Sequence, residues 1–235
     1  MTTVRGRQLL QMMLQAVAEA LGRDLRERLV FVGGSTTALF ITDEITLEDV
    51  RTTDDVDLIV DLAGYAEWAK LQDHLRRNGF KESPEDTVIC RMRLGNLKVD
   101  FMPDDEAILG FSNRWYAKGI ETAVTIQLTP DMTIRRLAPA LFVATKLEAY
   151  LGRGEGDFFT SRDLEDILLI VDGRPEIVAE IKEAEEGVRR FIAEQITALL
   201  ADPEFDAFLD GNIRGPEGRA DIVHERFVAI GQSGG

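Results

Sequence analysis

Two aspartates separated by one residue lie in a run whose pattern predicts a β-strand. Apolar Val56, Leu58 and Val60 alternate with Asp55 and Asp57, which is the period-two pattern of a pleated strand. Residues two apart point to the same face with Cα atoms roughly 6.6 Å apart, so the two carboxylates lie side by side. They repel by about 2–3 kcal/mol at an effective dielectric constant of about 20. The pair therefore indicates a site for a divalent cation.

A glycine-rich turn precedes these aspartates. Gly33, Gly34 and Ser35 follow the apolar run 29–32, a predicted strand, and lead into a predicted short helix that Ser35 can cap. Small residues at a helix start let a phosphate approach backbone N–H groups. Together with the paired carboxylates, this turn predicts a nucleotide site whose cofactor is Mg²⁺ or Mn²⁺.

A third carboxylate is expected on a β-hairpin farther along the chain. Predicted strands at 88–94 and 97–102 flank a Gly-Asn pair, a two-residue turn signal. Alternation directs Asp100 and Lys98 to one face of the second strand. With the two earlier aspartates, Asp100 would complete a triad for two magnesium ions, which prefer octahedral oxygen ligands. In the alternative, the earlier aspartates are a solvated strand end and Asp100 pairs with Lys98.

Composition and charge restrict the class of protein. The 235-residue chain is 45% hydrophobic and 29% charged, as in ordinary globular proteins, and its single cysteine, Cys90, excludes an internal disulfide. A net charge of −15 argues against long duplex DNA, whose binding usually needs a basic footprint. No apolar run approaches the length that spans a bilayer, and residues 7–21 read as an amphipathic helix, not a signal peptide. We expect a cytoplasmic protein with no membrane partner.

The order of elements predicts an α+β fold in two parts. Residues 1–137 read as a mixed-sheet α/β core and residues 138–235 as a helical C-terminal portion. Residues 42–53 are polar and acidic, and we expect them to form a loop, either over the site or as a plain surface excursion. The last four residues, 232–235, are expected to be disordered. Other helices are predicted at 64–78, at 140–151, at 160–171 and from 175 to about 184 or beyond, with a further helix that ends near 201. Two more strands are predicted at 124–128 and 133–136.

The motifs in this order resemble a known family. Gly34-Ser35, then Asp-x-Asp, then the later strand aspartate Asp100 are similar to the DNA-polymerase-β-type nucleotidyltransferase superfamily. More narrowly, the segment 144–153 (ATKLEAYLGR) followed by 161–167 (SRDLEDI) resembles the AbiEii/AbiGii and MenT-like toxin branch. That branch carries a helix lysine, an arginine seven residues on, and then Asp-x-x-Asp.

The resemblance implies a polymerase-β-like fold and transfer of a nucleoside monophosphate from a nucleoside triphosphate (NTP). It implies that Gly33, Gly34 and Ser35 hold the triphosphate and that Lys146 contacts a phosphate. It gives Asp163 or Asp166 a buttressing or acceptor-side role, and it makes Asp55 and Asp57 catalytic metal ligands, with Asp100 as the later strand aspartate of the superfamily pattern. The acceptor implied is tRNA or another macromolecular hydroxyl, and the partner implied is a cognate antitoxin.

The residues matched on the two helices also have simpler structural interpretations. Lys146 lies off the apolar stripe of its helix and could be a surface lysine. Asp163 sits at a capping-box position, and Asp166 could form a salt bridge with Lys146 or Arg153. Two other functions also remain open: transfer of a nucleotide to a small polycation such as an aminoglycoside, which the acidic charge suits, and a nucleotide-binding regulator without turnover.

Basic residues of the predicted hairpin allow two interpretations as well. Arg91 and Arg93 share one strand face, so they could line a groove for a phosphate-bearing acceptor. The alternative is that they are solvated surface charges.

Overall fold

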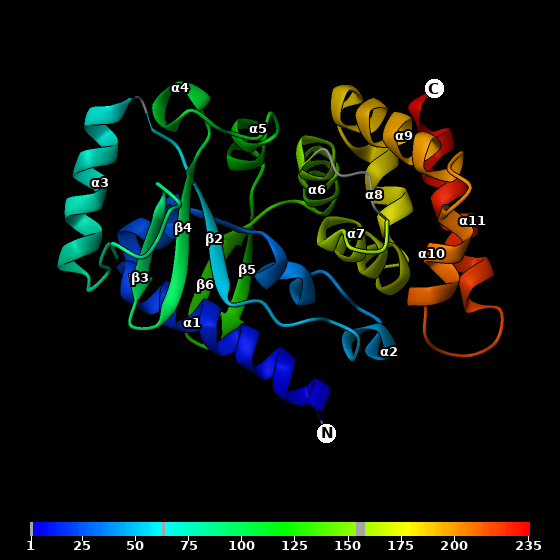
Figure 1. Cartoon of the computed structure of the whole chain (residues 1–235), viewed down its shortest axis with the longest axis horizontal. Coiled ribbons are helices and arrows are strands. Elements are labelled where there is room, and N and C mark those ends of the chain that lie inside the picture. The colour runs from blue at the N-terminus through cyan, green and yellow to red at the C-terminus, as the bar shows by residue number, and fades with distance from the viewer. Residues whose placement is uncertain (1, 63, 154–157) are drawn as a thin grey trace. The chain divides into compact units, whose positions relative to one another are not determined.

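The computed structural model describes residues 2–62, 64–153 and 158–235 and has an α+β fold (Figure 1). Contacts divide the chain into two compact units. The first, Met1–Thr36 with Arg51–Ala138, contains a mixed sheet, and the second, Thr37–Val50 with Pro139–Gly235, is helical. The boundary predicted at 137 lies one residue before the end of the first unit at Ala138, but the segment 37–50, predicted in the α/β core, belongs to the helical unit.

Six strands form the sheet of the first unit, in the order β3-β4-β2-β1-β6-β5. The β2–β4 and β1–β6 pairs are parallel and the other neighbours are antiparallel. The prediction of a strand over 88–90 is wrong, because Val88 and Ile89 are exposed and the strand begins at Arg91. The strands are β1 (Val30–Val32), β2 (Asp55–Val60), β3 (Arg91–Leu94), β4 (Leu97–Pro103), β5 (Val124–Thr129) and β6 (Met132–Arg136).

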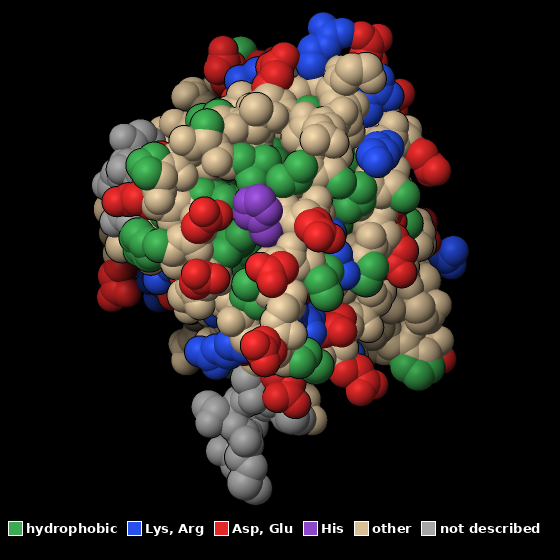
Figure 2. All heavy atoms as spheres, turned by 90° about the vertical axis from the view of Figure 1, so that its right-hand side faces the viewer, with side chains coloured by type: hydrophobic (Ala, Val, Ile, Leu, Met, Phe, Trp, Pro, Cys, Tyr) green, Lys and Arg blue, Asp and Glu red, His purple; other side chains and the backbone are tan. Residues whose placement is uncertain are grey.

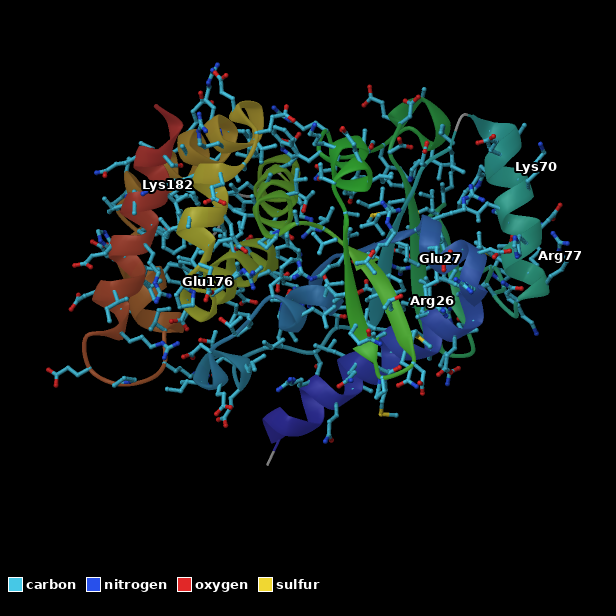
Figure 3. The ribbon with its side chains drawn as sticks, turned by 180° about the vertical axis from the view of Figure 1, so that it is seen from behind. Arg26, Glu27, Lys70, Arg77, Glu176 and Lys182 are labelled. Carbon is cyan, nitrogen blue, oxygen red and sulfur yellow. The ribbon has the colours of Figure 1, made fainter. Side chains whose placement is uncertain are left out.

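The longest helix, α1 (Thr2–Arg28), supplies much of the apolar cover of this sheet and packs against β2, β5 and β6. It extends beyond the predicted 7–21 and bends at Gly22, whose φ is +70°. Helix α3 (Tyr65–Arg77) carries Lys70 and Arg77 on its exposed side (Figure 3). The unit also contains the 3₁₀ segment η1 (Gly34–Leu39), which continues into the second unit, and the short helices α4 (Glu106–Leu109) and α5 (Tyr116–Glu121).

The second unit is built from helices around an aromatic core. Phe158 makes edge-on contacts with Phe205 and Phe208, and Phe205 makes one with Phe227. One face of the molecule presents many acidic side chains (Figure 2). The helices are α2 (Glu44–Leu47), α6 (Pro139–Arg153), α7 (Arg162–Gly173), α8 (Ile177–Glu183), α9 (Glu186–Leu200), α10 (Phe205–Asn212) and α11 (Arg219–Gly231).

The C-terminus is ordered, contrary to the prediction of disorder. Gln232–Gly234 form a 3₁₀ turn, and Ser233 is buried with its Oγ donating to the carbonyl oxygen of Ile230 at 2.6 Å. Among the described helices, none combines the length and the apolar character that a membrane span requires.

The polar segment after residue 42 is not a free loop but part of the second unit. Asp43 caps α2, and the backbone N–H of Thr42 donates to the carbonyl oxygen of Gly173, at the end of α7, at 2.8 Å. Arg219 donates through Nη2 to Asp43 (2.8 Å) and through Nε to Asp172 (2.7 Å). The segment is therefore held onto α7, and the expectation of a loop over the site is replaced by this packing.

Candidate functional site

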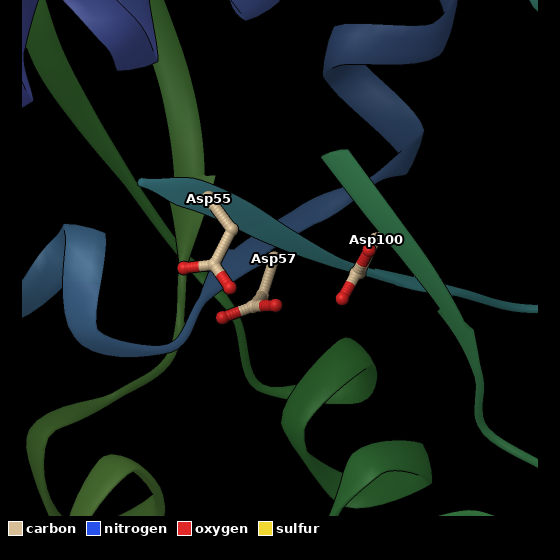
Figure 4. Close-up of side chains that lie close together, drawn as sticks. All are labelled: Asp55, Asp57 and Asp100. Atoms are coloured by element: carbon tan, nitrogen blue, oxygen red, sulfur yellow. The ribbon is translucent and has the colours of Figure 1, made fainter. Parts of the chain in front are cut away.

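The three predicted strand aspartates converge on one face of the first unit's sheet (Figure 4). The parallel register of β2 and β4 pairs Asp57 with Asp100, and Asp55 shares the face of Asp57 because it lies two residues earlier. Each offers a carboxylate oxygen, and these three oxygens lie within 4.8 Å of one another. Asp100 is buried, whereas Asp55 and Asp57 are partly exposed. Carboxylates on two neighbouring strands thus form one potential metal-ligand set.

Gly33 positions the carboxylate of Asp57. The β1–β2 register pairs Val32 with Asp57, so Gly33 follows directly beside that carboxylate. A Cβ added at Gly33 would lie 1.9 Å from Oδ2 of Asp57, and the φ of Gly33 is +72°, a region that favours glycine. Both the close approach and the backbone conformation therefore require glycine here.

The turn after Gly33 forms a 3₁₀ helix beginning at Gly34, where a short helix capped by Ser35 was predicted. Thr36 donates from its backbone N–H and its Oγ1 to the carbonyl oxygen of Gly33, at 3.1 and 2.8 Å. Ser35 is 1% exposed, and its Oγ has no hydrogen-bond partner among the described residues. A buried hydroxyl without a partner costs free energy unless a ligand supplies one.

Arg91 forms an ion pair with the triad, which sequence analysis missed. Its Nε and Nη2 donate to Oδ1 and Oδ2 of Asp100 at 2.7 and 2.8 Å, and Nη2 lies 3.7 Å from Oδ2 of Asp55. The hairpin turn could have revealed this contact, because the antiparallel register that it sets pairs Arg91 with Asp100. The alternative partner, Lys98, binds Asp54 instead, at 2.6 Å.

The two hairpin arginines are therefore neither free groove-lining groups nor solvated charges. Arg93 donates to both carboxylate oxygens of Asp86, at 2.7 and 2.8 Å. Each arginine is thus committed to one aspartate in bidentate geometry, the strongest form of this ion pair.

Burial and neighbouring negative charges both raise the pKa of one carboxyl group of the triad. Burial raises the pKa of Asp55, and the neighbouring charges of Asp100 and Asp54 raise it further, against the opposing effect of Arg91. Burial also raises the pKa of the Cys90 thiol to about 12, so Cys90 stays protonated and is not a nucleophile at neutral pH. The carboxylates, rather than the thiol, are therefore the groups of this region that could bind a cation.

Lys146 lies in the second unit, at the centre of an ionic cluster. Its Nζ lies 3.1 Å from Oδ1 of Asp163 and 2.6 Å from Oδ2 of Asp166, and its side chain is only 10% exposed. Burial opposes its charge, but Asp166 and then Asp163 outweigh burial and raise the pKa of Lys146. Asp166 also accepts from Thr37 Oγ1 at 3.2 Å, and Arg153 binds Asp163 at 2.5 Å. Lys146 is therefore not a surface lysine.

Asp163 was predicted either as a site residue or as the cap of its helix, but another residue caps that helix, α7. Ser161 is the N-cap of α7, and its side chain accepts from the N–H of Leu164. Asp163 is 2% exposed and faces Lys146 and Arg153 instead. The predicted Asp166–Lys146 salt bridge is confirmed.

The residues of the first unit fit a divalent cation with a phosphate ligand. Three carboxylates supply the oxygen ligands that Mg²⁺ prefers, and with Arg91 the group carries a formal charge of −2. The unpartnered hydroxyl of Ser35 is a donor suited to a phosphate oxygen.

No family model and no curated protein matches the chain. The crystal structure of JHP933 from Helicobacter pylori is similar to it, with 12% sequence identity and a TM-score of 0.42, over 97% of this chain and 91% of that one. At this identity and TM-score, the match assigns neither a fold family nor an activity.

Proposed function

We propose that the protein is a metal-dependent nucleotidyltransferase, which transfers a nucleoside monophosphate from an NTP to an acceptor hydroxyl. The observation that carries this proposal is the convergence of Asp55, Asp57 and Asp100 beside the Gly33 turn. The resemblance to polymerase-β-type enzymes assigns the same residues to the same chemistry.

In this mechanism the carboxylates of β2 and β4 would hold the cation. Bound Mg²⁺ would supply charge stabilisation for in-line displacement at the α-phosphorus. Gly33 keeps the backbone close to Asp57, and Gly34 and Ser35 contact the triphosphate, with Ser35 Oγ donating to a phosphate oxygen. The acceptor hydroxyl gives its proton to a carboxylate of the triad or to water, its oxygen forms a bond to the α-phosphorus, and the bond to the leaving pyrophosphate breaks.

Lys146 and Asp166 enter the proposal through the resemblance, as a phosphate contact and its buttress. Asp166 and Asp163 keep Lys146 charged despite its burial, and a fixed ammonium is a suitable group for binding phosphate.

The test is transfer of label from each α-³²P-labelled NTP, with Mg²⁺ and total cell RNA, analysed on a gel. We expect label on an acceptor with the wild type and at least about a hundredfold less with Asp57→Asn, because a lost metal ligand removes several kcal/mol of charge stabilisation. Asp61→Asn is the matched control, since Asp61 is exposed and follows the same strand. If the wild type binds NTP but transfers no label to any acceptor, the protein is a non-catalytic nucleotide-binding regulator and the proposal fails.

The acceptor that the resemblance suggests is tRNA or another RNA, in a toxin–antitoxin setting with an antitoxin partner. A small polycation is the second candidate, and one observation favours it. The hairpin cations near the triad, Arg91, Arg93 and Lys98, are each bound to an aspartate, and the net charge is −15. Few positive charges are left there for an RNA backbone.

Replacing the RNA by an aminoglycoside in the same assay separates the two acceptors. Label on RNA, with binding that weakens steeply as salt rises, would identify a nucleic acid as the acceptor. Label on the aminoglycoside alone would identify the small polycation.

A further inference from the structure

The positively charged side chain of Arg91 lies against the carboxylate triad. Arg91 and Asp100 are register partners on β3 and β4, and the guanidinium occupies both oxygens of Asp100. The pair is largely buried, with side-chain exposures of 16% for Arg91 and 11% for Asp100. Arg91 also lies 3.7 Å from Asp55, so it faces two of the three potential metal ligands.

An arginine in this place has two effects on a divalent cation. Its two N–H groups use one acceptor site on each oxygen of Asp100, which restricts how that carboxylate can ligate a metal. Its positive charge also repels a second cation at short range, and in a partly buried site this repulsion is weakly screened.

The formal charges of Arg91 and the three aspartates also disfavour a second divalent cation. Three carboxylates carry −3, and Arg91 reduces this to −2, which one divalent cation neutralises. Binding a second divalent cation at Asp100 with Arg91 still in place would leave the group at +2 before a triphosphate arrives. The ion pair therefore favours single occupancy of the triad in the absence of nucleotide.

We propose that Arg91 is a built-in counter-ion of the triad, a positioning residue that competes with divalent metal for Asp100. In the free protein it holds Asp100 and limits metal binding to the Asp55–Asp57 side, and a metal ion that ligates Asp100 fully must displace the guanidinium. This inference deepens the proposed function and rests on its metal site.

Arg93 provides a matched control within the same strand. It lies two residues after Arg91 and makes the same bidentate contact, but with Asp86 (2.7 and 2.8 Å). Asp86 is not part of the triad. Substituting either arginine removes one charge and one bidentate pair from β3, and only the Arg91 substitution changes the triad.

The test is a Mn²⁺ titration of the full-length protein without nucleotide, followed by electron paramagnetic resonance of free Mn²⁺, on variants whose fold is verified by circular dichroism. Arg91→Gln should bind Mn²⁺ at least about tenfold more tightly than the wild type, because a like charge beside the ion has been removed. It should also gain a second bound ion. Arg93→Gln should match the wild type.

Arg91→Lys adds a second, independent comparison. An ammonium keeps the charge but lacks the planar fork that binds the two oxygens of Asp100 in parallel, so the Mn²⁺ affinity of Arg91→Lys should lie between those of the wild type and Arg91→Gln. This variant also decides the question if Arg91→Gln does not fold, since an affinity no higher than that of the wild type would then contradict competition.

The outcomes separate this inference from the proposed function. Wild-type binding of Mn²⁺ with unchanged or weaker binding by Arg91→Gln overturns the counter-ion role and leaves the metal site intact. No Mn²⁺ binding by the wild type or by either Arg91 variant overturns both.

Discussion

At Gly33 the backbone passes so close to Asp57 that a single methyl group would occupy the space of a carboxylate oxygen. Gly22, in the bend of α1, has nearly the same φ, +70° against +72°, yet a Cβ there would meet nothing within 4 Å. The two glycines share a backbone conformation and differ only in what lies beside them. They therefore allow the clash to be separated from backbone strain.

We predict that Gly33→Ala displaces Asp57 and weakens Mn²⁺ binding by at least about tenfold, since one of the carboxylate ligands is moved. Both alanine variants should lose about 1–2 kcal/mol of stability from the left-handed conformation. Urea unfolding and Mn²⁺ titration measure the two effects. If Gly22→Ala weakened Mn²⁺ binding as much as Gly33→Ala, the close approach would not be the cause.

Lys146 supports a second prediction at the residue scale, about stability. Lys146→Met would leave the buried carboxylates of Asp163 and Asp166 without their shared cation, and breaking such a pair costs about 3–5 kcal/mol. Arg153→Met is the control, because Arg153 contacts Asp163 from a side chain that is 68% exposed, and exposed pairs contribute about 0–1 kcal/mol. If urea unfolding showed that Lys146→Met and Arg153→Met lose the same free energy of unfolding, burial would not determine how much each ion pair contributes.

At the scale of elements, the network of Arg219 with Asp43, Thr46 and Asp172 anchors α2 on the helical unit. Hydrogen bonds from the backbone of Thr46 and from Arg219 lower the pKa of Asp43 from 3.8 to about 2. A carboxyl group whose pKa is lower in the folded than in the unfolded state stabilises the fold at pH values above its unfolded-state pKa. That stabilisation is lost as the pH falls toward 2.

The expected result is that Asp43→Asn lowers stability at pH 6 by about 1 kcal/mol, because the neutral amide still caps α2 but loses the charge-assisted hydrogen bond from Arg219, and that the difference from the wild type shrinks between pH 4 and pH 2. Urea unfolding at a series of pH values measures it. A difference that is the same at pH 6 and pH 2.5 would show that the charge of Asp43 contributes nothing.

The helices and strands could largely be predicted from the local sequence pattern, but the elements and residues that they contact could not. Alternation at Val56, Leu58 and Val60 predicts β2, and the Gly-Asn turn predicts the β3–β4 hairpin. The parallel register that places Asp57 beside Asp100 depends on a crossover that no local signal encodes. Likewise, the polar segment with α2 reads as a loop because its partner Asp172 lies 126 residues away from Thr46. Of the candidate site, the aspartates were predicted and their arginine counter-ion was missed.

For the whole molecule, the acidic balance sets which partners are favoured. A net charge of −15 repels a polyphosphate duplex, and such repulsion acts over the Debye length, about 10 Å at 0.1 M salt. The hairpin cations do not offset it, because each is committed to an aspartate.

We predict no saturable binding of a 30-base-pair DNA duplex up to about 100 μM protein at physiological salt, since non-specific binders reach dissociation constants of about 10⁻⁴–10⁻⁶ M through phosphate contacts. Fluorescence anisotropy of a labelled duplex measures it, with a basic protein as positive control. Micromolar binding that weakens with salt would reveal a basic surface outside the pairs described above.

The most direct measurement is anomalous diffraction from crystals of the protein grown with Mn²⁺. The account predicts an anomalous peak at about 2.1–2.2 Å from carboxylate oxygens of Asp55 and Asp57, on the side of the Gly33 turn. A well-ordered triad with no peak there at saturating Mn²⁺, and Asp57 directed away from Gly33, would contradict the proposed metal centre and with it the nucleotidyl transfer.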